Sequence, residues 1–288
     1  MRKYCITFPA YSFLFLLSAC GAAKKTAKPK DIIPGTWQST PIAIDGDSKD
    51  WPSPYPNYDS KSKIAYATAN DGKYLYVTME TGDELTQIKI LKAGMAVSID
   101  TGGNKTPIFT IKYPLPNENL DLEMPQMGNS DKNAAVHTAR QVSQYVHKAI
   151  EQANQYAIEG FNTCDGGYMV AQINTCGIKV KARLDEYKEL VWEAAIPLKA
   201  LYHVDSLPAT SAGKPISICF NITGLKAPKG KGVDNVNGNM NSGMGGQGGQ
   251  HNSMQGGGGR QVRQQDNPLE HLYNATKTWK QTGLAVHP

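Results

Sequence analysis

Short runs of alternating apolar and polar residues, each ended by a turn signal, fill the chain from residue 41 to residue 286. Residues 63–69 and 74–79 form the clearest pair, because Asn70, Asp71 and Gly72 follow the first run and favour a hairpin. Further runs of this kind cover residues 95–100, 108–113, 168–171, 178–184, 190–196, 216–222 and 276–286. Many short strands at such spacing predict one all-β domain, an antiparallel β-sandwich of the jelly-roll type.

The alternation within a run also predicts which side chains share a face. In residues 190–196, Trp192, Ala194 and Ile196 fall on one face, while Val191, Glu193 and Ala195 fall on the other. In residues 74–79, Leu75, Val77 and Met79 fall on one face, while Tyr74, Tyr76 and Thr78 fall on the other. We expect both runs to be half-buried strands of the sandwich.

Two segments depart from the strand pattern. Residues 130–160 place alanine and valine at helical spacing between Ser130, a plausible N-cap, and Gly160, a plausible stop, which predicts one long helix inserted against the sandwich. Residues 224–268 are rich in glycine, methionine and glutamine and hold almost no large apolar side chain. Such a segment buries too little surface to offset its ordering entropy, so we predict a disordered loop.

The N-terminus has the features of an export signal. A basic start, an apolar run and small residues before Cys20 predict a lipoprotein signal peptide over residues 1–19. The sequence L-S-A-C resembles a bacterial lipobox, so we expect Cys20 to be lipidated and residues 20–40 to form a tether. Gly21 and the basic residues that follow favour a periplasm-facing outer-membrane lipoprotein, which contacts the membrane only through its lipid.

Three cysteines remain in the expected mature domain. Cys164 and Cys176 are close enough in sequence to pair in an oxidising compartment, and the spacing alone leaves a disulfide and two free thiols equally open. Cys219 lies in an apolar run, where we expect a buried free thiol.

Several motifs, in their order along the chain, resemble the family 9 carbohydrate-binding module and its superfamily of sugar- and haem-binding sandwiches. These motifs are I-D-G-D-S-K-D-W at residues 44–51, N-D-G-K-Y-L-Y-V at 70–77, G-M-A-V-S-I-D-T-G-G-N-K at 94–105, E-L-V-W-E-A-A-I-P-L-K-A-L at 189–201 and I-C-F-N-I at 218–222. The resemblance implies a β-sandwich over residues 41–286, in which the long helix and the glycine-rich loop are insertions.

The resemblance also implies that residues 44–51 form a strand followed by a turn. Asp45 then caps backbone amides while Trp51 packs beneath. The alternative is a calcium site formed by Asp45 and Asp47 with Asp100 and Asn104, although the spacing lacks the distal glutamate of an EF-hand.

A non-catalytic carbohydrate-binding function follows from the same resemblance, with a glycan or polysaccharide as the partner. Aromatic faces hold sugar rings, and the candidate platforms are Trp279 and, as weaker candidates, Trp51, Tyr55 and Tyr58. The stretch Q-I-K-I-L-K, with Ile88 and Ile90, lacks the tryptophan that sugar binders of the family carry there.

Other functions remain open or are disfavoured by the sequence. A haem-binding electron-transfer module would need axial ligands from residues such as Met79, Met95, Met169 and His203. A structural lipoprotein that contacts another envelope protein is a third reading. Common hydrolase, metalloprotease and phosphate-loop motifs are missing, so we do not expect an enzyme. Much of the net charge of +5 lies in the first thirty residues, so it does not indicate nucleic-acid binding.

Overall fold

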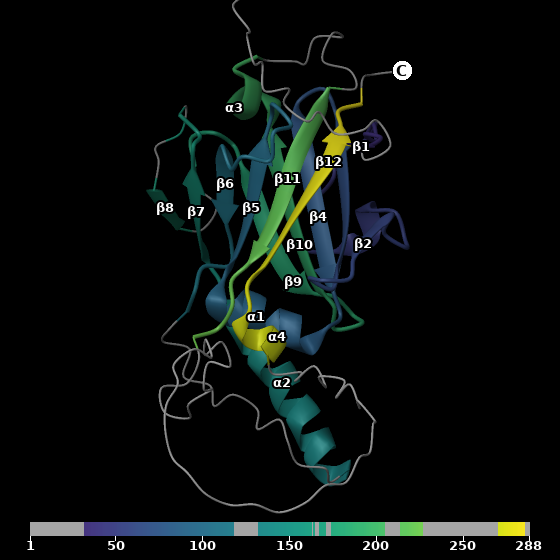
Figure 1. Ribbon diagram of the computed structural model, residues 1–288, viewed down its shortest axis with the longest axis vertical. Coiled ribbons are helices and arrows are strands. Elements are labelled where there is room, and N and C mark those ends of the chain that lie inside the picture. The colour runs from purple at the N-terminus through teal and green to yellow at the C-terminus, as the bar shows by residue number, and fades with distance from the viewer. Residues whose placement is uncertain are drawn as a thin grey trace, which may run out of the picture.

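Two β-sheets face each other in the computed structural model of the protein (Figure 1). The structure describes residues 32–117, 132–162, 164, 167–170, 174–204, 214–226 and 270–285, and for residues 132–141, 167–170 and 270 it describes only the backbone. The expected signal peptide, Cys20, the tether up to residue 31 and residues 227–268 of the expected glycine-rich loop lie outside these ranges.

The larger sheet has seven strands and the smaller has five, and the strands pair antiparallel except for β1 with β12. In spatial order the larger sheet contains β1 (Ile32–Ile33), β12 (Thr276–Gly283), β11 (Pro215–Ile222), β5 (Met95–Asp100), β6 (Phe109–Lys112), β7 (Gln155–Glu159) and β8 (Gly167–Val170). The smaller sheet contains β2 (Asn57–Asp59), β3 (Ile64–Asn70), β4 (Tyr74–Thr81), β10 (Leu190–Pro197) and β9 (Lys179–Leu184). The chain is therefore strand-rich and forms a β-sandwich, as the alternation predicts.

The main hydrophobic core lies between the two sheets. Trp192 of β10 is fully buried there, and its Nε1 donates a hydrogen bond to the carbonyl of Tyr113 at 2.9 Å. Phe220 of β11 enters the same core from the larger sheet and lies against the ring of Tyr66. The predicted grouping of side chains on one face is confirmed for both strands, because Trp192, Ala194 and Ile196 of β10 and Leu75, Val77 and Met79 of β4 all belong to this core.

The outer face of the smaller sheet is also covered, so the expectation of half-buried strands is wrong for β4 and β10. Residues 42–55 cross this face, where Ile42, Trp51 and Tyr55 pack on Tyr76 and Ala195 in a second hydrophobic cluster. The strand predicted to open residues 44–51 does not form, and the segment instead reaches a short 3-10 helix, η2 (Ser48–Asp50).

Helices close the ends of the sandwich. Figure 1 shows α1 (Glu84–Ala93), α2 (Lys132–Gln152) and α4 (Glu270–Tyr273) at the lower end and α3 (Leu198–Tyr202) at the upper end. Helix α1 contacts both α2 and α4, and its first turn is capped by Asp83, which accepts a hydrogen bond from the Thr86 N–H. Among the described residues, no helix is both long and apolar enough to cross a membrane.

Helix α2 lies within the predicted helical segment but ends earlier than expected. The chain leaves the helix at Gln152 and forms β7, which pairs with β6 and β8. Tyr156 and Ile158 point into the core from this strand, so residues 155–159 use a period of two where the alanine spacing suggested a helix.

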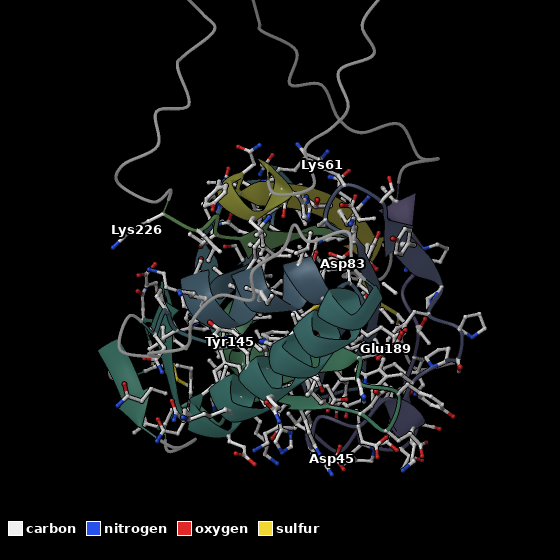
Figure 2. All side chains as sticks on the ribbon, turned by 90° about the horizontal axis from the view of Figure 1, so that it is seen from below. Asp45, Lys61, Asp83, Tyr145, Glu189 and Lys226 are labelled. Atoms are coloured by element: carbon white, nitrogen blue, oxygen red, sulfur yellow. A yellow bond between two sulfur atoms is a disulfide. The ribbon has the colours of Figure 1, made fainter. Side chains whose placement is uncertain are left out.

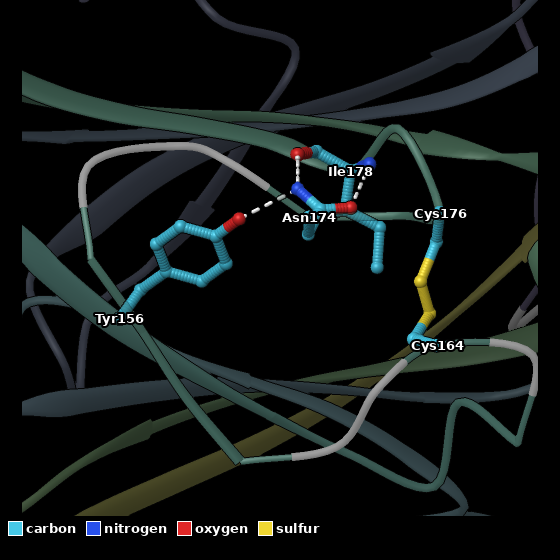
Figure 3. The surroundings of a disulfide bond; sticks show 5 residues. All are labelled: Tyr156, Cys164, Asn174, Cys176 and Ile178. Atoms are coloured by element: carbon cyan, nitrogen blue, oxygen red, sulfur yellow. Dashed lines mark hydrogen bonds between the residues drawn. A yellow bond between two sulfur atoms is a disulfide. The ribbon is translucent and has the colours of Figure 1, made fainter.

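A disulfide joins Cys164 to Cys176 next to this edge of the larger sheet, with a Cα–Cα distance of 5.3 Å. Nearby, the Asn174 amide donates hydrogen bonds to the Tyr156 hydroxyl and the Ile178 carbonyl, each at 2.6 Å (Figure 3). Cys219 is free and buried in β11, as predicted.

The ends of the segment between β11 and α4 are held together. The N–H of Leu225 donates a hydrogen bond to the carbonyl of Leu272 at 2.8 Å. The chain therefore leaves the sandwich at residue 226 and returns to it at residue 271 in the same place. Most of the predicted glycine-rich loop lies between these two residues.

Candidate functional site

The loop that begins at Asp45 is held in shape by its own aspartates. Asp45 Oδ1 accepts the N–H of Asp47 at 2.9 Å, and Asp47 Oδ1 accepts the N–H of Lys49 at 3.1 Å. Asp50 Oδ2 accepts the N–H of Ala43 at 2.9 Å. The three carboxylates thus act as caps of backbone amides, which is the structural reading of this motif.

Gly46 brings this loop, residues 45–51, against strand β9. Its φ of +81° lies in the left-handed region, and a Cβ at this position would lie 2.6 Å from the Cβ of Arg183. Only glycine satisfies both conditions without a shift of the backbone, so the loop and β9 are in direct contact.

Glu193 of β10 holds the loop against the smaller sheet. This residue is 0% exposed, and its carboxylate accepts hydrogen bonds from Trp51 Nε1 at 2.6 Å, the Gly46 N–H at 2.7 Å and the Asp45 N–H at 3.2 Å. Burial raises the pKa of Glu193 to about 7, and the donors from Trp51 and Gly46 oppose that rise. Both carboxylate oxygens are engaged with the protein itself.

The turn between β9 and β10 presents an aromatic ring to solvent. Asp185 Oδ1 accepts the N–H groups of Tyr187 at 2.9 Å and Glu189 at 2.8 Å, so the turn is closed by one side chain. Tyr187 lies in this turn and is 77% exposed. Asp185 holds its backbone, and its exposed ring is available for stacking against a ligand.

A surface hollow of about 460 Å³ lies between the loop and the turn, and we call it the first hollow. It contains hydrogen-bond donors, acceptors and the Tyr187 ring, which is the mixture found in small-molecule sites. Its lining residues are Gly46, Asp47, Ser48, Lys49, Trp51, Ser53, Arg183, Leu184, Asp185, Glu186 and Tyr187.

The four aromatic residues proposed from the sequence do not form one binding face. Trp51 is 7% exposed and contributes to the first hollow from a buried position, so it is a structural residue rather than a sugar platform. Tyr55 is half-buried, and its hydroxyl is hydrogen bonded to Thr78 Oγ1 at 3.1 Å. Tyr58 is 64% exposed on β2, the edge strand of the smaller sheet.

Trp279 lies on the other sheet. In β12 it pairs with Cys219, and the alternation of β11 turns Cys219 away from the core that Ile218 and Phe220 enter. The ring of Trp279 is half-buried, and the Lys277 ammonium lies over it, 5.8 Å from its centroid. Trp279 therefore faces away from the first hollow on the opposite side of the sandwich.

The residues proposed for calcium are also separated. Asp45 and Asp47 belong to the loop on the smaller sheet, whereas Asp100 ends β5 of the larger sheet. The buried Asp100 carboxylate accepts the N–H groups of Gly102, Asn104 and Thr106 at 2.8–2.9 Å. Within the described ranges no cluster of three or more histidine, cysteine or acidic side chains is placed to hold a metal ion.

Nor does the structure favour the haem alternative. Met79 and Met95 pack in the main core, and His203 terminates α3 in the left-handed conformation. The side chain of Met169 lies outside the described part of the chain. Buried methionines with no histidine from the same cluster are ordinary core residues.

Tyr187 is the site residue that the sequence interpretation missed. The segment D-E-Y-K-E reads only as a turn between two strands, and a lone aromatic residue within four charged neighbours is its one unusual feature. An exposed aromatic residue in a short polar hairpin is the signal by which it could have been found.

Comparisons with known proteins give little further support. No protein-family model matches the chain, and no curated protein matches it. One similar solved structure is a family 9 carbohydrate-binding module from Caldicellulosiruptor kristjanssonii in complex with cellotriose, with 11% identity, a TM-score of 0.27, and coverage of 66% of this chain and 75% of that chain. Another, from the same organism in complex with glucose, has 13% identity, a TM-score of 0.27, and coverage of 68% and 79%. Similarity at this level supports no conclusion about ligand or fold. The functional proposal therefore rests on the geometry of the candidate site.

Proposed function

We propose that the protein is a non-catalytic carbohydrate-binding protein and that a saccharide binds in the first hollow against Tyr187. The observation that carries this proposal is the exposed Tyr187 side chain at the margin of a polar hollow, in a turn whose backbone is held by Asp185. Sugar rings present apolar C–H faces and a rim of hydroxyl groups. An aromatic face with donors and acceptors around it matches both features.

The polar lining supports recognition of hydroxyl groups. Lys49 and Arg183 offer donors, whereas Asp47 and Glu186 offer acceptors, so the hollow carries both signs of charge. Asp47 and Lys49 already form an ion pair at 2.9 Å, which holds their side chains in place. A neutral, hydroxyl-rich ligand fits this mixed lining better than an ion of one sign.

The carboxyl groups near the hollow support binding rather than hydrolysis. Burial, with the nearby carboxylates of Glu189 and Asp185, raises the pKa of Glu80 to about 7, and Glu193 has a similar value. Glycoside hydrolysis needs two carboxyl groups that reach the scissile bond. Glu193 is fully buried, and its oxygens already accept the N–H groups of Trp51, Gly46 and Asp45, so it has no free reach toward a substrate.

A glycan array followed by calorimetry tests the proposal. Single-site sugar binding falls at Kd values of roughly micromolar to millimolar, so calorimetry at high protein concentration is required. Tyr187→Ala should weaken binding roughly tenfold or more, because the stacking face is lost. Tyr58→Ala removes an equally exposed tyrosine on β2 and should leave binding unchanged.

Two results would contradict this assignment. If Trp279→Ala abolishes binding while Tyr187→Ala does not, the saccharide binds to the larger sheet, as the sequence resemblance implies. If no glycan binds, a Soret band from the purified protein would support the haem alternative, and its absence would support a structural lipoprotein.

From the N-terminal sequence we also propose that the protein is exported, lipidated at Cys20 and anchored to the outer membrane facing the periplasm. The support is the lipobox-like L-S-A-C and the basic residues after it. Cell fractionation of the Cys20→Ala variant should show a free or unprocessed form. A correctly processed, membrane-bound variant would overturn the lipid anchor.

A further inference from the structure

A second hollow, of about 260 Å³, lies on the other side of the same turn. It shares Leu184 and Tyr187 with the first hollow, so the two are adjacent and meet at the exposed ring. Its lining residues are Gly82, Glu84, Gln87, Val142, Ser143, Val146, Leu184, Tyr187, Lys188 and Glu189.

Helix α2 forms one wall of this second hollow. Val142 and Val146 lie behind this wall and are each only 1% exposed, whereas Ser143 between them is partly exposed. Glu189, at the end of the turn, lies beside α2 in Figure 2 and also lines the hollow. The second hollow thus offers a hydroxyl group and carboxylates beside Tyr187, and the hydroxyl groups of a sugar can hydrogen bond to them.

The two hollows differ in size and meet at Tyr187. The first is about 460 Å³ and the second about 260 Å³, and both hold charged side chains of both signs, which in the second are Glu84, Lys188 and Glu189. A single sugar unit would be held in the first hollow against Tyr187. A longer chain that continues over the ring enters the second hollow.

We propose that the saccharide is an extended chain of several sugar units that crosses Tyr187 and occupies both hollows. This inference depends on the proposed function, because it assumes that the first hollow binds sugar. It gives the inserted helix α2 a role, since α2 forms a wall that lengthens the binding surface. The expected substrate class is the interior of a neutral polysaccharide or a long oligosaccharide.

Calorimetry with the full chain, purified in detergent, tests the chain-length dependence. The probes are cello-, xylo- and manno-oligosaccharides of one to six units. In the series that binds, the Kd should fall at least tenfold between the shortest member that binds and the hexamer. A Kd that does not change with length would overturn the inference and leave the proposed function standing.

Two tryptophan substitutions on α2 separate the second hollow from the first. Ser143→Trp fills the second hollow and should remove most of the gain with length, while binding of the shortest probe remains. Gln144→Trp places the same side chain on the exposed side of the helix and should keep the gain. If Ser143→Trp does not fold, as a melting curve would show, the length dependence of the unmodified protein still decides.

The outcomes distinguish the two proposals. Loss of binding at every length in Tyr187→Ala, together with loss of only the length dependence in Ser143→Trp, supports both. Binding that depends on Tyr187 with no effect of Ser143→Trp overturns the extended chain alone. Failure of all three probe series to bind overturns the proposed function, and this inference with it.

Discussion

Glu193 lies on the outer face of the smaller sheet, yet it is fully buried. Its carboxylate accepts hydrogen bonds from three N–H groups and so holds the loop that crosses this face. The alternation of β10 predicts that Glu193 lies opposite the core-facing Trp192. It does not predict burial, which depends on the loop that crosses the outer face of the sheet.

The raised pKa of Glu193 makes stability depend on pH. Glu193 has a pKa of about 7 in the folded protein, against its ordinary value of 4.5, so its protonated form stabilises the native state. Its contribution is therefore fully present below about pH 4.5 and is lost as the pH rises through about 7. The free energy of unfolding should fall over this range, and Glu193→Gln should flatten part of that fall.

Urea denaturation at several pH values between 4.5 and 8.5 measures this effect. Glu186→Gln removes an exposed carboxyl group from the same region and serves as the control. An unchanged slope in Glu193→Gln would show that its carboxylate is stabilised when charged. Glu80, whose pKa is also raised to about 7, accounts for part of the fall that remains.

Gly46 determines the local structure because it has no Cβ atom. Gly46→Ala should destabilise the protein by about 1–3 kcal/mol, because the left-handed backbone and the contact with Arg183 both disfavour a Cβ. Thermal or urea unfolding measures the loss. Gly72→Ala is the matched control, since the nearest atom to a Cβ there is 4.0 Å away and we expect little change.

The aromatic residues show where sequence reasoning succeeds and fails at this scale. The period of two correctly predicts that Trp192 shares a face with Ala194 and Ile196. The burial of Trp51 and the exposure of Tyr187 depend on which segments cover each position, and no local pattern encodes that cover. Of the candidate site, the sequence therefore predicted only the loop of residues 45–51.

Helices and strands could be predicted where the apolar residues recur with one clear period. Most strands of the two sheets were found from alternation, whereas α1 was missed because Ile88, Lys89 and Ile90 are all buried and leave no polar stripe. The end of α2 was placed too late because alanine spacing fits both a helix and β7. In both cases tertiary packing decided between patterns that the sequence left ambiguous.

The disulfide stabilises the edge formed by β7, β8 and β9. It closes a segment with a sequence separation of 12, and the chain-entropy model assigns roughly 3 kcal/mol to a loop of this size. Cys164→Ser with Cys176→Ser should lower the free energy of unfolding by about 2–4 kcal/mol. Guanidinium unfolding measures it, with unfolding of the unmodified protein under reductant as the comparison.

A result near zero would show that native packing alone holds this edge. Cys219 provides an internal check in the same samples. Because it is buried in β11, its thiol should react with a labelling reagent only after unfolding.

Over the whole molecule, polar contacts join the two sheets along one edge of the sandwich. Asp59 of the smaller sheet accepts a hydrogen bond from Thr278 at 2.9 Å and forms an ion pair with Lys280 at 3.3 Å, both in β12. Farther along, Asn70 donates a hydrogen bond to the Ala285 carbonyl and accepts one from the Ala285 N–H. These contacts connect the two sheets where β3 and β12 run near each other.

Asp59→Ala should therefore loosen the sandwich as a whole. The side chain is only 14% exposed, and its loss leaves Thr278 and Lys280 without their acceptor, at a cost of about 1–3 kcal/mol. Thermal unfolding should remain a single transition at a lower temperature. If Asp59→Ala changes the melting temperature no more than Glu186→Ala, a variant at an exposed turn position, the edge contacts contribute little.

The hydrogen bond between Leu225 and Leu272 has a practical consequence for work with this protein. Because both ends of the intervening segment meet at one place, the entropy of closing it depends only weakly on its length, by about 0.6 kcal/mol for each doubling. A fluorescent domain with neighbouring termini could replace residues 230–265 and leave the sandwich intact. The chain would then carry an optical label at a defined place, with both sheets unchanged.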